Sequence, residues 1–501
     1  MPGSEEEHPK VQFFCNPLYC RCGRYHFPQR IILAFLLHIC LQNNLTSRIV
    51  LNVAIVEIMK ENSVKVGKAA CPEYIQHHTV NFTKSQVNGA KKQHAWPSDA
   101  KSILLVSFYL GYLISQIPGG WISDKFGARY VLIGSVTITT IGTGVFPVMT
   151  NRWGWMTGVA LRFFLGAAHG PCLPAISSLV NAWIPLNERH LWGSIAFSGS
   201  NLGNLLGNTI SGVLIDTFWW DVAFYFWAAY SLLYLIFVVL LLYSYPEMHP
   251  FIMTKEVEYI QQMGAGEAAV KKKDLRTPWK KILMNRPYWA NVLAQFGHNL
   301  IYIPLVTYLP TYMSDILQFD AEQNGLSSAM PFVCLWITSL ILASTACYFL
   351  RCMSEKFFVT FFGAGCNVAS SIFLLGAGYS GCNRYLAIAL FNFCMIIKAF
   401  YYVTLPMNIA NLSKHYGGIM FGISNTVGAI SGIIGNVNIG ILLKENQFHE
   451  WQTAFWITFG ICVVTTIIFA IFGSTERQSF DYEESDERAS TKATNTADDI
   501  K

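Results

Sequence analysis

Charged residues are scarce in this sequence. Only 13% of its 501 residues are Asp, Glu, Lys or Arg, whereas 52% are hydrophobic. A soluble domain cannot bury that much apolar surface, so the composition excludes an ordinary soluble protein and indicates a chain that crosses a lipid bilayer several times. The net charge of +5 is small and gives no indication of binding to nucleic acid. We expect no such partner.

Motifs of catalysis and of metal binding are also missing. The sequence has no paired C-x-x-C, no His-rich cluster and no G-x-S-x-G, which are patterns of metal sites and of serine hydrolases. Its 13 cysteines are scattered, mostly in apolar runs where they act as small hydrophobic residues. We therefore expect no metal, no cofactor and no enzymatic activity. The polar first 30 residues show no cleavage pattern, so we expect no removable signal peptide.

Apolar segments long enough to cross a bilayer, about 20 residues each, recur along the chain. They predict an all-α membrane protein with six-helix bundles over 31–243 and 288–473, a central loop over 244–287, an N-terminal tail over 1–30 and a charged, disordered tail over 474–501. Twelve spans exclude a seven-helix receptor. The spans are Ile31–Met59, Ser102–Ile122, Tyr130–Met149, Met156–Trp183, Trp192–Ile215, Val222–Tyr243, Tyr288–Leu317, Leu326–Phe349, Phe357–Gly378, Tyr385–Asn408, Tyr416–Leu443 and Thr453–Phe472.

The distribution of basic residues predicts the orientation in the membrane. The central loop is rich in Lys and Arg, so the positive-inside rule places it, and with it both tails, in the cytoplasm. The loop 60–101 also carries seven lysines, although the span count places it outside. It contains Asn81 in the sequon Asn81-Phe82-Thr83, which is glycosylated only on the lumenal side. The other outer loops are nearly free of Lys and Arg, which favours this orientation.

The fifth span of each half carries a similar short pattern. Ser200-Asn201-Leu202-Gly203 lies in the first half and Ser424-Asn425-Thr426-Val427-Gly428 in the second. Both present small residues that let helices approach closely, and their matching positions indicate two related bundles. Asn201 either lines a substrate path or bridges two helices, and we favour the bridge.

A charged residue lies in the middle of the first span. Asn44, Arg48 and Asn52 are four residues apart, so they share one face of a helix. An arginine at mid-bilayer depth costs about 3 kcal/mol even on the mildest insertion scale. Such a residue persists only where it faces protein or water. Arg48 therefore either pairs with a neighbouring helix and fastens the bundle, or it faces a substrate path and binds an anion.

Further polar residues occur in the fourth, seventh and tenth spans. Arg162 and His169 are seven residues apart and share a face, His298 and Tyr302 belong to a polar stripe with Asn291 and Gln295, and Lys398 lies in the tenth span. Spans one, four, seven and ten together can line a site at the midplane between two bundles.

The positive charges in the spans outnumber the negative ones. Arg48, Arg162 and Lys398 have no obvious acidic partner in the spans, and a buried charge requires one. An anionic substrate could supply it. A hydrogen-bonded structural role is the alternative for each histidine, and the alternative for Lys398 is that it pairs with another group or reaches to the interface. We predict a pH-sensitive coupling role for His169 and a substrate-binding role for Arg48, Arg162, His298, Tyr302, Lys398, Asn44 and Asn52.

Two motifs resemble those of the major facilitator superfamily. The segment Gly120–Arg129 joins spans two and three in the form G-x-x-x-D-[RK]-x-G-x-[RK], and Arg162-x-x-x-Gly166-x-x-x-Gly170 lies in span four. Asp124 can accept hydrogen bonds from a helix N-terminus or pair with a basic group across the bundle, and glycines permit close packing. We predict that Asp124, Gly127 and Arg129 form a conformational gate whose opening lets the two halves rock.

A further set of segments resembles the anion transporters that include sialin, the vesicular glutamate transporters and the sodium–phosphate cotransporters. The resemblance extends over about 31–480 and implies coupled transport of organic anions or phosphate, driven by Na⁺, H⁺ or membrane potential. It matches Arg48 and Arg162 to arginines of that family. His169 departs from a family glutamate, Lys398 from a small residue, and 408–413 lacks the family's aspartate. The segments are Gln116–Gly120, Pro185–Arg189, Pro246–Pro250, Leu309–Met313 and Gln323–Ser328.

These features together predict a secondary active transporter of organic anions that works by alternating access. A sodium-dependent cotransporter of inorganic phosphate is the alternative within this class, and a channel is a rival outside it. We expect a monomer whose partners are a small anion, a co-transported Na⁺ or H⁺, and the bilayer. The lack of a clear acidic dileucine signal favours the plasma membrane over a lysosomal or vesicular membrane.

Overall fold

The computed structural model describes residues 28–58, 96–97, 100–263, 265, 277–319, 321–443 and 447–481. Within these ranges the chain is helical and forms no strand. The predicted glycosylation site Asn81 and much of both tails lie outside the described residues.

The N-terminal half begins at the first membrane helix. Pro171 divides its fourth span into two helices, because proline has no N–H to continue the hydrogen bonding of the preceding helix. Its helices are α1 (Gln29–Ile58), α2 (Ala100–Phe126), α3 (Ala128–Trp153), α4 (Trp155–His169), α5 (Cys172–Trp183), α6 (Arg189–Thr217) and α7 (Trp220–Leu241), with the short η2 (Leu186–Glu188) between α5 and α6.

The C-terminal half follows a linking segment with two short helices, α8 (Thr254–Gln262) and α9 (Trp279–Leu283), and the 3-10 turn η3 (Pro246–Met248). Its ninth and tenth spans are each assembled from consecutive pieces. The helices are α10 (Arg286–Asp315), α11 (Ala321–Cys352), α12 (Glu355–Phe358), the π-helix η5 (Val359–Ala364), α13 (Gly365–Gly378), α14 (Arg384–Lys398), α15 (Phe400–Val403), α16 (Leu405–Leu412), α17 (Gly417–Leu442) and α18 (Phe448–Phe472).

Within the described ranges, ten helical segments are long and apolar enough to cross a membrane. The helices α1 and α6, with 30 and 29 residues, run among them and complete the twelve spans. They are less apolar because they carry the polar groups of the bundle interior, such as Arg48 and Asn201. The outer surface is apolar, as in Ile114, which is 66% exposed. The prediction of an all-α, multi-pass membrane protein is confirmed.

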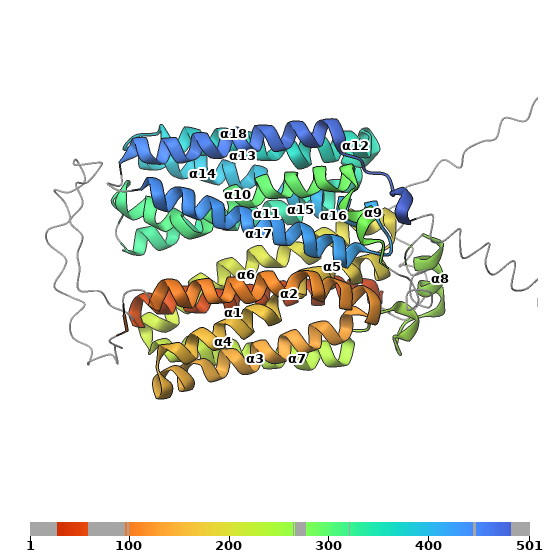
Figure 1. The fold of residues 1–501 in the computed structure, drawn as a ribbon, viewed down its shortest axis with the longest axis horizontal. Helices are drawn as coiled ribbons and strands as arrows, with labels where there is room; N and C mark the ends of the chain where they lie inside the picture. The colour runs from red at the N-terminus through yellow and green to blue at the C-terminus, as the bar shows by residue number, and fades with distance from the viewer. Residues whose placement is uncertain are drawn as a thin grey trace, which may run out of the picture.

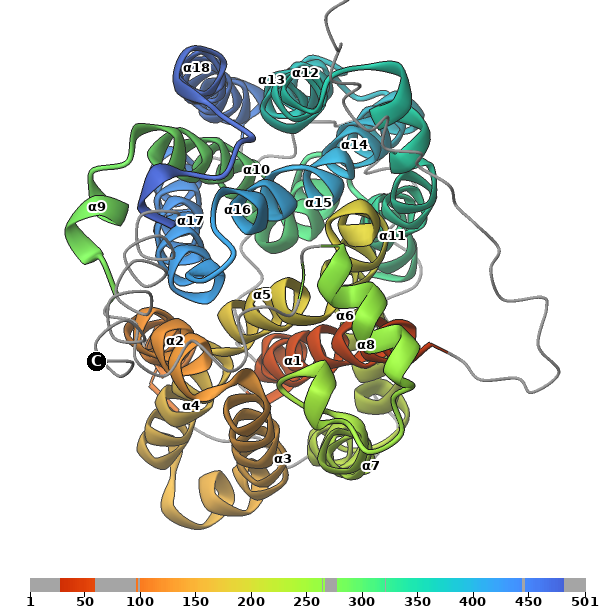
Figure 2. The ribbon, with the colours of Figure 1, turned by 90° about the vertical axis from the view of Figure 1, so that its right-hand side faces the viewer.

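The two halves lie side by side, with their helices running in nearly the same direction (Figure 1). The end-on view separates them into two bundles (Figure 2). Across the boundary, α2 and α5 lie against α17, and α6 lies against α11. A site shared by the halves has to lie along this boundary.

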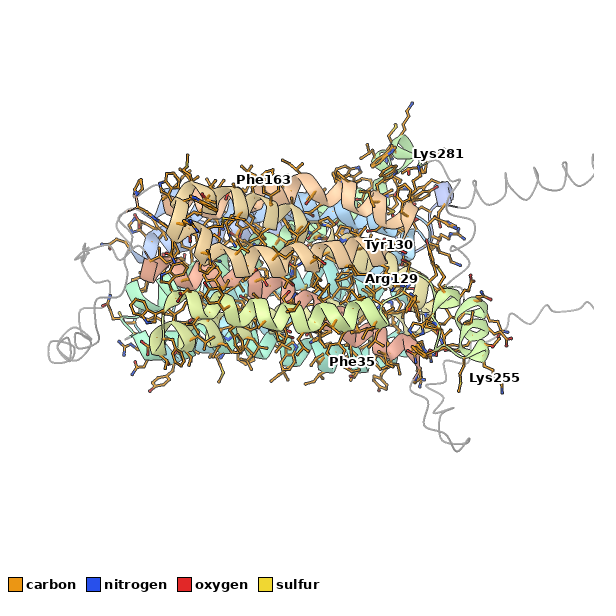
Figure 3. The ribbon with its side chains drawn as sticks, turned by 90° about the horizontal axis from the view of Figure 1, so that it is seen from below. Phe35, Arg129, Tyr130, Phe163, Lys255 and Lys281 are labelled. Atoms are coloured by element: carbon orange, nitrogen blue, oxygen red, sulfur yellow. The ribbon has the colours of Figure 1, made fainter. Side chains whose placement is uncertain are left out.

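One end of the bundles, called the inner end below, carries α8, α9 and the turn between α2 and α3. Arg129, Lys255 and Lys281 lie at this end (Figure 3), which is the end predicted to be cytoplasmic. The opposite, outer end includes the loop between α13 and α14, where Cys382 is disulfide-bonded. Disulfides persist in oxidising compartments, so this bond agrees with the predicted orientation.

The linking segment is fastened to the N-terminal half at the inner end. Arg30 at the start of α1 pairs with Glu188 at 2.8 Å and with Glu256 of α8 at 3.2 Å between nitrogen and oxygen. Its guanidinium also lies 4.9 Å from the ring centre of Tyr259. The helix α8 is therefore attached to the N-terminal bundle.

Residues 474–481 belong to the tail for which we predicted disorder, yet they pack against the inner end. The amide of Gln478 donates to the carbonyl of Leu412 at 3.0 Å, and Asn408 Nδ2 donates to the carbonyl of Ser474 at 3.1 Å. Ser474, Gln478 and Asp481 thus have hydrogen-bonding partners in the C-terminal half, and the prediction of disorder does not hold for this segment.

Asp481 is the centre of this docked segment. Its buried carboxylate accepts hydrogen bonds from Ser413 Oγ at 2.7 Å and from His415 Nδ1 at 3.0 Å, and it pairs with Arg477. Burial alone would raise the pKa of the Asp481 carboxyl, but the hydrogen bond and charge of His415, together with Arg477, outweigh burial and hold the pKa well below its usual value. The segment is thereby bound to the loop that precedes α17.

Candidate functional site

Arg48 lies against an aromatic wall on α2. Its Nη2 donates a hydrogen bond to the hydroxyl of Tyr109 at 2.6 Å, and its guanidinium lies 4.6 Å from the centre of the same ring. The rings of Phe108 and Tyr112 are 5.4 and 5.9 Å away. Each such ring attracts a cation by about 0.5–2 kcal/mol. Arg48 is thus held in place while its side chain remains partly exposed.

Arg162 and His169 of α4 meet the same wall. The Arg162 guanidinium lies 4.7 Å from the centre of Phe108, and its Nη1 donates to the carbonyl of Arg48 at 3.5 Å. The His169 ring packs edge-on against Phe108 at 5.3 Å. Within the described residues, Arg162 Nε and both ring nitrogens of His169 are buried and have no hydrogen-bond partner. The structure therefore gathers Arg48, Arg162 and His169 around one phenyl ring.

Fixed carboxylates do not neutralise this arginine pair. In the part of the chain that the structure describes, neither Arg48 nor Arg162 forms an ion pair, whereas Arg30 and Arg477 at the inner end do. The aromatic rings attract the two guanidinium groups but carry no net charge, so they stabilise these cations without neutralising them. Two positive charges thus lack a negative partner, which is what a site for an anion requires.

The seventh span contributes two of the predicted residues. The ring of His298 stacks on Tyr401 at 3.6 Å and lies 5.8 Å from the ring of Tyr302. Tyr302 is close enough to Arg48 to interact with it electrostatically, and its hydroxyl donates to Asn201 Oδ1 at 3.3 Å. Tyr302 therefore joins the arginine pair from the C-terminal half, with His298 behind it.

The other polar residues of that stripe serve the packing of the C-terminal half. Asn291 Oδ1 accepts from Asn408 Nδ2 at 2.9 Å, and Gln295 Oε1 accepts from Ser424 Oγ at 2.7 Å. Both side chains are fully buried.

Lys398 lies apart from the arginine pair, inside the C-terminal bundle. It is fully buried, and its Nζ donates to Asn367 Oδ1 at 3.4 Å. Its charge acts on His298 and on the thiols of Cys366 and Cys394. The structure therefore places this cation behind His298, not beside Arg48.

The polar face of α1 leads from the outer end to Arg48. Asn52 is exposed, and Asn44 and Arg48 are partly exposed. By contrast, Thr46 and Leu51 on other faces of the helix are fully buried. Asn52 lies on the outer side of Arg48 and Asn44 on its inner side, so this less buried face of α1 continues on both sides of the arginine.

Asp124 closes the inner end between the two halves. Its carboxylate accepts hydrogen bonds from the backbone N–H groups of Gly418 at 3.2 Å and Ile419 at 2.9 Å, and from Ser178 Oγ at 2.7 Å. The first N–H groups of a helix lack intrahelical partners and carry partial positive charge. Of the two partners predicted for Asp124, the structure shows the helix N-terminus, that of α17.

The other two predicted gate residues stay within the N-terminal half. Gly127 has φ +94°, and a Cβ there would lie 2.6 Å from Ser244 Oγ, so glycine is needed for the turn. Arg129 donates to the carbonyl of Val239 at 2.9 Å and lies 4.1 Å from the ring centre of Tyr243. These residues shape the turn that presents Asp124, but they do not bridge the halves.

Further bonds hold the inner end shut. Asn181 Nδ2 donates to the carbonyl of Ser413 at 3.3 Å, and Arg189 Nη1 donates to the carbonyl of Ala410 at 3.1 Å. Together with Asp124, they join the second, fourth and fifth spans of one half to the tenth and eleventh spans of the other.

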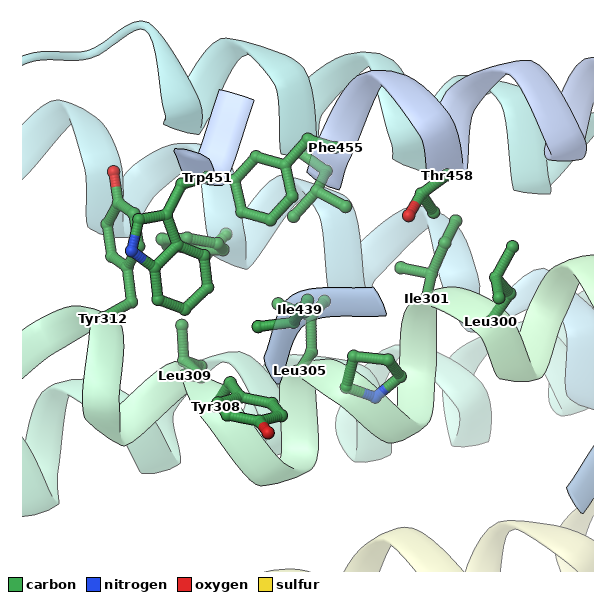
Figure 4. A pocket seen from close by; sticks show the side chains of 13 residues that line it. Leu300, Ile301, Leu305, Tyr308, Leu309, Tyr312, Ile439, Trp451, Phe455 and Thr458 are labelled. Carbon is green, nitrogen blue, oxygen red and sulfur yellow. The ribbon is translucent and has the colours of Figure 1, made fainter. Parts of the chain in front are cut away.

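A small apolar hollow lies elsewhere, inside the C-terminal bundle (Figure 4). Leu305, Leu309 and Phe455 are among the side chains around it, and it contains none of the predicted site residues. Its lining offers an anion no positive charge, so it is not the functional site.

The aromatic wall was not among the site residues predicted from the sequence. Phe108, Tyr109 and Tyr112 supply every ring within 6 Å of the Arg48 guanidinium in the described part of the chain. Their spacing over one helical turn was the available signal, but aromatic residues are so common in apolar spans that it did not stand out. Arg162, which packs against this wall, could be predicted from the sequence because a charged residue in a membrane span is rare.

The sequence was compared with protein families and with known proteins, and the matches agree on one family. The sequence matches the family model of the Major Facilitator Superfamily over residues 39–436. Sialin of Ovis aries is 31% identical over 86% of this chain and 87% of that protein. A Drosophila melanogaster protein assigned as an inorganic phosphate cotransporter is 28% identical over 92% and 88%. Vesicular glutamate transporter 3 of Danio rerio is 28% identical over 95% and 78%.

Solved structures agree on the fold. The E. coli fucose:proton symporter superposes with a TM-score of 0.61 at 14% identity, over 88% of this chain and 98% of that chain. A proton:xylose symporter gives a TM-score of 0.63 at 15% identity, over 91% and 98%. At these identities the likeness concerns the arrangement of the helices alone.

Proposed function

This chain belongs to the Major Facilitator Superfamily, and from that premise we propose that it carries organic anions by alternating access, binding them at Arg48 and Arg162. It is a transporter and not an enzyme. The observation that carries the proposal is the arginine pair on Phe108, which has no carboxylate partner among the described residues. A travelling anion supplies the missing negative charge.

The binding residues fall into three groups. Arg48 and Arg162 attract the anion, Tyr302 and His298 close the site from the C-terminal half, and the third group consists of Asn52, on the outer side of Arg48, and Asn44, on its inner side. Lys398 adds positive potential from behind His298. Because the inner end is closed by Asp124, the anion enters this conformation from the outer end.

Coupling follows from the membrane potential. One charge crossing about 60 mV changes the free energy by about 1.4 kcal/mol, a tenfold concentration ratio. A monovalent anion that enters a negative cytosol therefore needs a co-transported cation, whereas one that enters a positive vesicle lumen does not. We propose Na⁺ or H⁺ as the coupling ion, in the plasma membrane or in a lysosomal or vesicular membrane.

His169 is the candidate for proton coupling. Both ring nitrogens are free of hydrogen bonds within the described residues, and the groups that face it are Arg162, Arg48 and Phe108. An anion between the arginines and this ring would favour its protonated form. If transport has the same pH profile in His169→Gln as in the unmutated protein, this role is excluded.

Sodium-dependent phosphate cotransport is the second candidate. It is favoured by the relative assigned as an inorganic phosphate cotransporter, whereas the vesicular glutamate transporter favours an organic anion. A bidentate guanidinium suits phosphate and carboxylate alike, so the arginine pair fits both candidates.

Uptake into proteoliposomes tests the proposal. Radiolabelled inorganic phosphate, glutamate and a panel of other organic anions are offered under imposed Na⁺, H⁺ and voltage gradients. We expect saturable uptake with counterflow, which a channel does not show, and its loss in Arg48→Ala. Arg152→Ala, which removes an exposed arginine at the outer end of α3, is the matched control. Undiminished uptake in Arg48→Ala at equal abundance contradicts the assignment.

A further inference from the structure

Two asparagines in matching places connect the halves at the level of the membrane interior. Asn201 lies in α6 and Asn425 in α17, the fifth span of each half. With a rise of 1.5 Å per residue, they lie about 18 and 12 Å from the inner ends of their helices. Each side chain forms hydrogen bonds with the opposite bundle, and these bonds are separate from those of Asp124.

Asn201 accepts two hydrogen bonds from the C-terminal half. Its Oδ1 is 2.8 Å from the hydroxyl of Tyr402 and 3.3 Å from that of Tyr302. The asparagine is fully buried. If the bundles separated here, the hydroxyls of Tyr402 and Tyr302 would lose their acceptor on Asn201. The free energy cost of these lost hydrogen bonds opposes separation.

Asn425 donates two hydrogen bonds to the N-terminal half. Its Nδ2 is 2.8 Å from the hydroxyl of Tyr112 and 2.7 Å from Gln116 Oε1, both on α2. The two asparagines thus differ in their hydrogen-bonding role, since Asn201 accepts hydrogen bonds and Asn425 donates them. Together they join the halves along both sides of the boundary, through α6 and through α2.

Both connections start on tyrosines of the anion site. The Tyr112 ring lies 5.9 Å from the guanidinium of Arg48, and Tyr302 interacts electrostatically with the same arginine. Arg48 is therefore separated from each asparagine by a single side chain, Tyr302 for Asn201 and Tyr112 for Asn425.

We propose that Asn201 and Asn425 are positioning residues that hold the two bundles together beneath the arginine pair, so that their bonds must break each time the inner end opens. The inference rests on the proposed function in one respect, because the movement that these bonds oppose is the transport movement. It adds a second set of cross-bundle bonds to the Asp124 gate.

Hydrogen exchange at the gate tests this inference without any substrate. The amides of Gly418 and Ile419 donate to Asp124 only while the inner end is shut, so their exchange in the full chain, reconstituted in lipid nanodiscs, reports opening. We expect about threefold to tenfold faster exchange in Asn201→Ala and in Asn425→Ala, the factor that one hydrogen bond contributes. Asn425→Gln, which keeps an amide donor, should restore part of the protection.

The chain offers matched controls on the same helices. Asn208 donates only to Asn204 within α6, and Asn436 lies near Thr307 of its own half. Asn208→Ala and Asn436→Ala should leave the exchange unchanged. Tyr402→Phe removes the shorter of the two hydrogen bonds of Asn201 and should give part of the effect of Asn201→Ala, and the two changes combined should give no more than Asn201→Ala alone.

The outcomes separate the two proposals. Unchanged exchange in Asn201→Ala, Asn425→Ala and Tyr402→Phe overturns the inference, as does an equal increase in the two control variants. Neither result concerns Arg48, whose role is decided by uptake in Arg48→Ala. If an alanine variant does not fold, Tyr402→Phe alone decides the outcome for Asn201.

Discussion

Arg48 and Arg162 come from different helices, yet their guanidinium groups lie over one ring, that of Phe108, at 5.4 and 4.7 Å from its centre. Like charges repel, so a fold brings them together only with some compensation. The phenyl ring provides part of it. Under the proposed function a bound anion provides the rest, which would account for an arginine pair with no carboxylate partner among the described residues.

Replacing the shared ring should weaken anion binding. In Phe108→Leu both guanidinium groups lose an aromatic face, which costs ~1–2 kcal/mol and raises the KM for the transported anion roughly fivefold to thirtyfold. Phe164→Leu is the control, because Phe164 is 62% exposed on the outer surface of α4. Equal KM values in the two variants, measured by uptake into proteoliposomes, would contradict this role.

Removing the charge of Asp124 should loosen the inner end. The carboxylate satisfies two N–H groups at the positive end of α17, and Asp124→Asn weakens that interaction by about 1 kcal/mol. We expect roughly fivefold faster hydrogen exchange at Gly418 and Ile419 and a lower transport rate. Asp216→Asn, at an exposed position near the outer end of α6, should change neither quantity.

The docked segment 474–481 should be insensitive to mild acid. The pKa of Asp481 is lowered in the folded chain, so its contribution is complete above the ordinary value of about 3.8 and is lost as the pH falls through the lowered pKa. We therefore expect the amide of Lys414, which donates to this carboxylate, to keep its protection from about pH 8 to about pH 5.

A substitution of Asp481 should have the effect that mild acid lacks. Asp481→Asn replaces one carboxylate oxygen by an amide nitrogen, which cannot accept the hydrogen bonds of Ser413, Lys414 and His415 as the carboxylate does. The loss costs about 1–3 kcal/mol and should release the segment at every pH in that range. Hydrogen exchange at Lys414, corrected for the intrinsic rate, measures this release. Glu476→Gln, a change on an exposed side chain, serves as the comparison, and release in both variants would refute the role of Asp481.

Gly127→Ala should destabilise the turn between α2 and α3. The positive φ and the approach of Ser244 Oγ to 2.6 Å of a new Cβ both oppose a side chain there, and we expect a loss of ~1–3 kcal/mol. Thermal unfolding in detergent measures this loss. Gly134→Ala is the control, because a Cβ at Gly134 meets nothing within 4 Å.

The helices could be predicted from the sequence because the bilayer imposes a length on them. All twelve apolar segments correspond to helices or consecutive helical pieces, and the polar face of α1 is the partly exposed one. Asp124 was found from its motif, but Arg48 and Arg162 were found for a related reason. A charge in or beside a membrane span is costly, so each one indicates a specific partner.

The partners themselves could not be predicted, because they depend on which helices meet. The helix N-terminus that binds Asp124 could be identified only from the position of α17. The docking of Asp481 depends on a loop 66 residues earlier in the chain, and its surroundings are charged, as in a disordered tail. Lys398 appeared from sequence to belong beside Arg48, but the packing of α13 against α14 places it next to Asn367.

The hydrogen bonds at Asp124 also have an osmotic consequence. When α17 moves away, the Asp124 carboxylate and the amides of Gly418 and Ile419 lose each other as partners. Water must then bind these groups, because the first N–H groups of a helix have no partner within the helix. Opening therefore takes up water. Solutes that are excluded from protein surfaces, such as sucrose, disfavour hydration of this kind, so the protein should respond to water activity as well as to its anion.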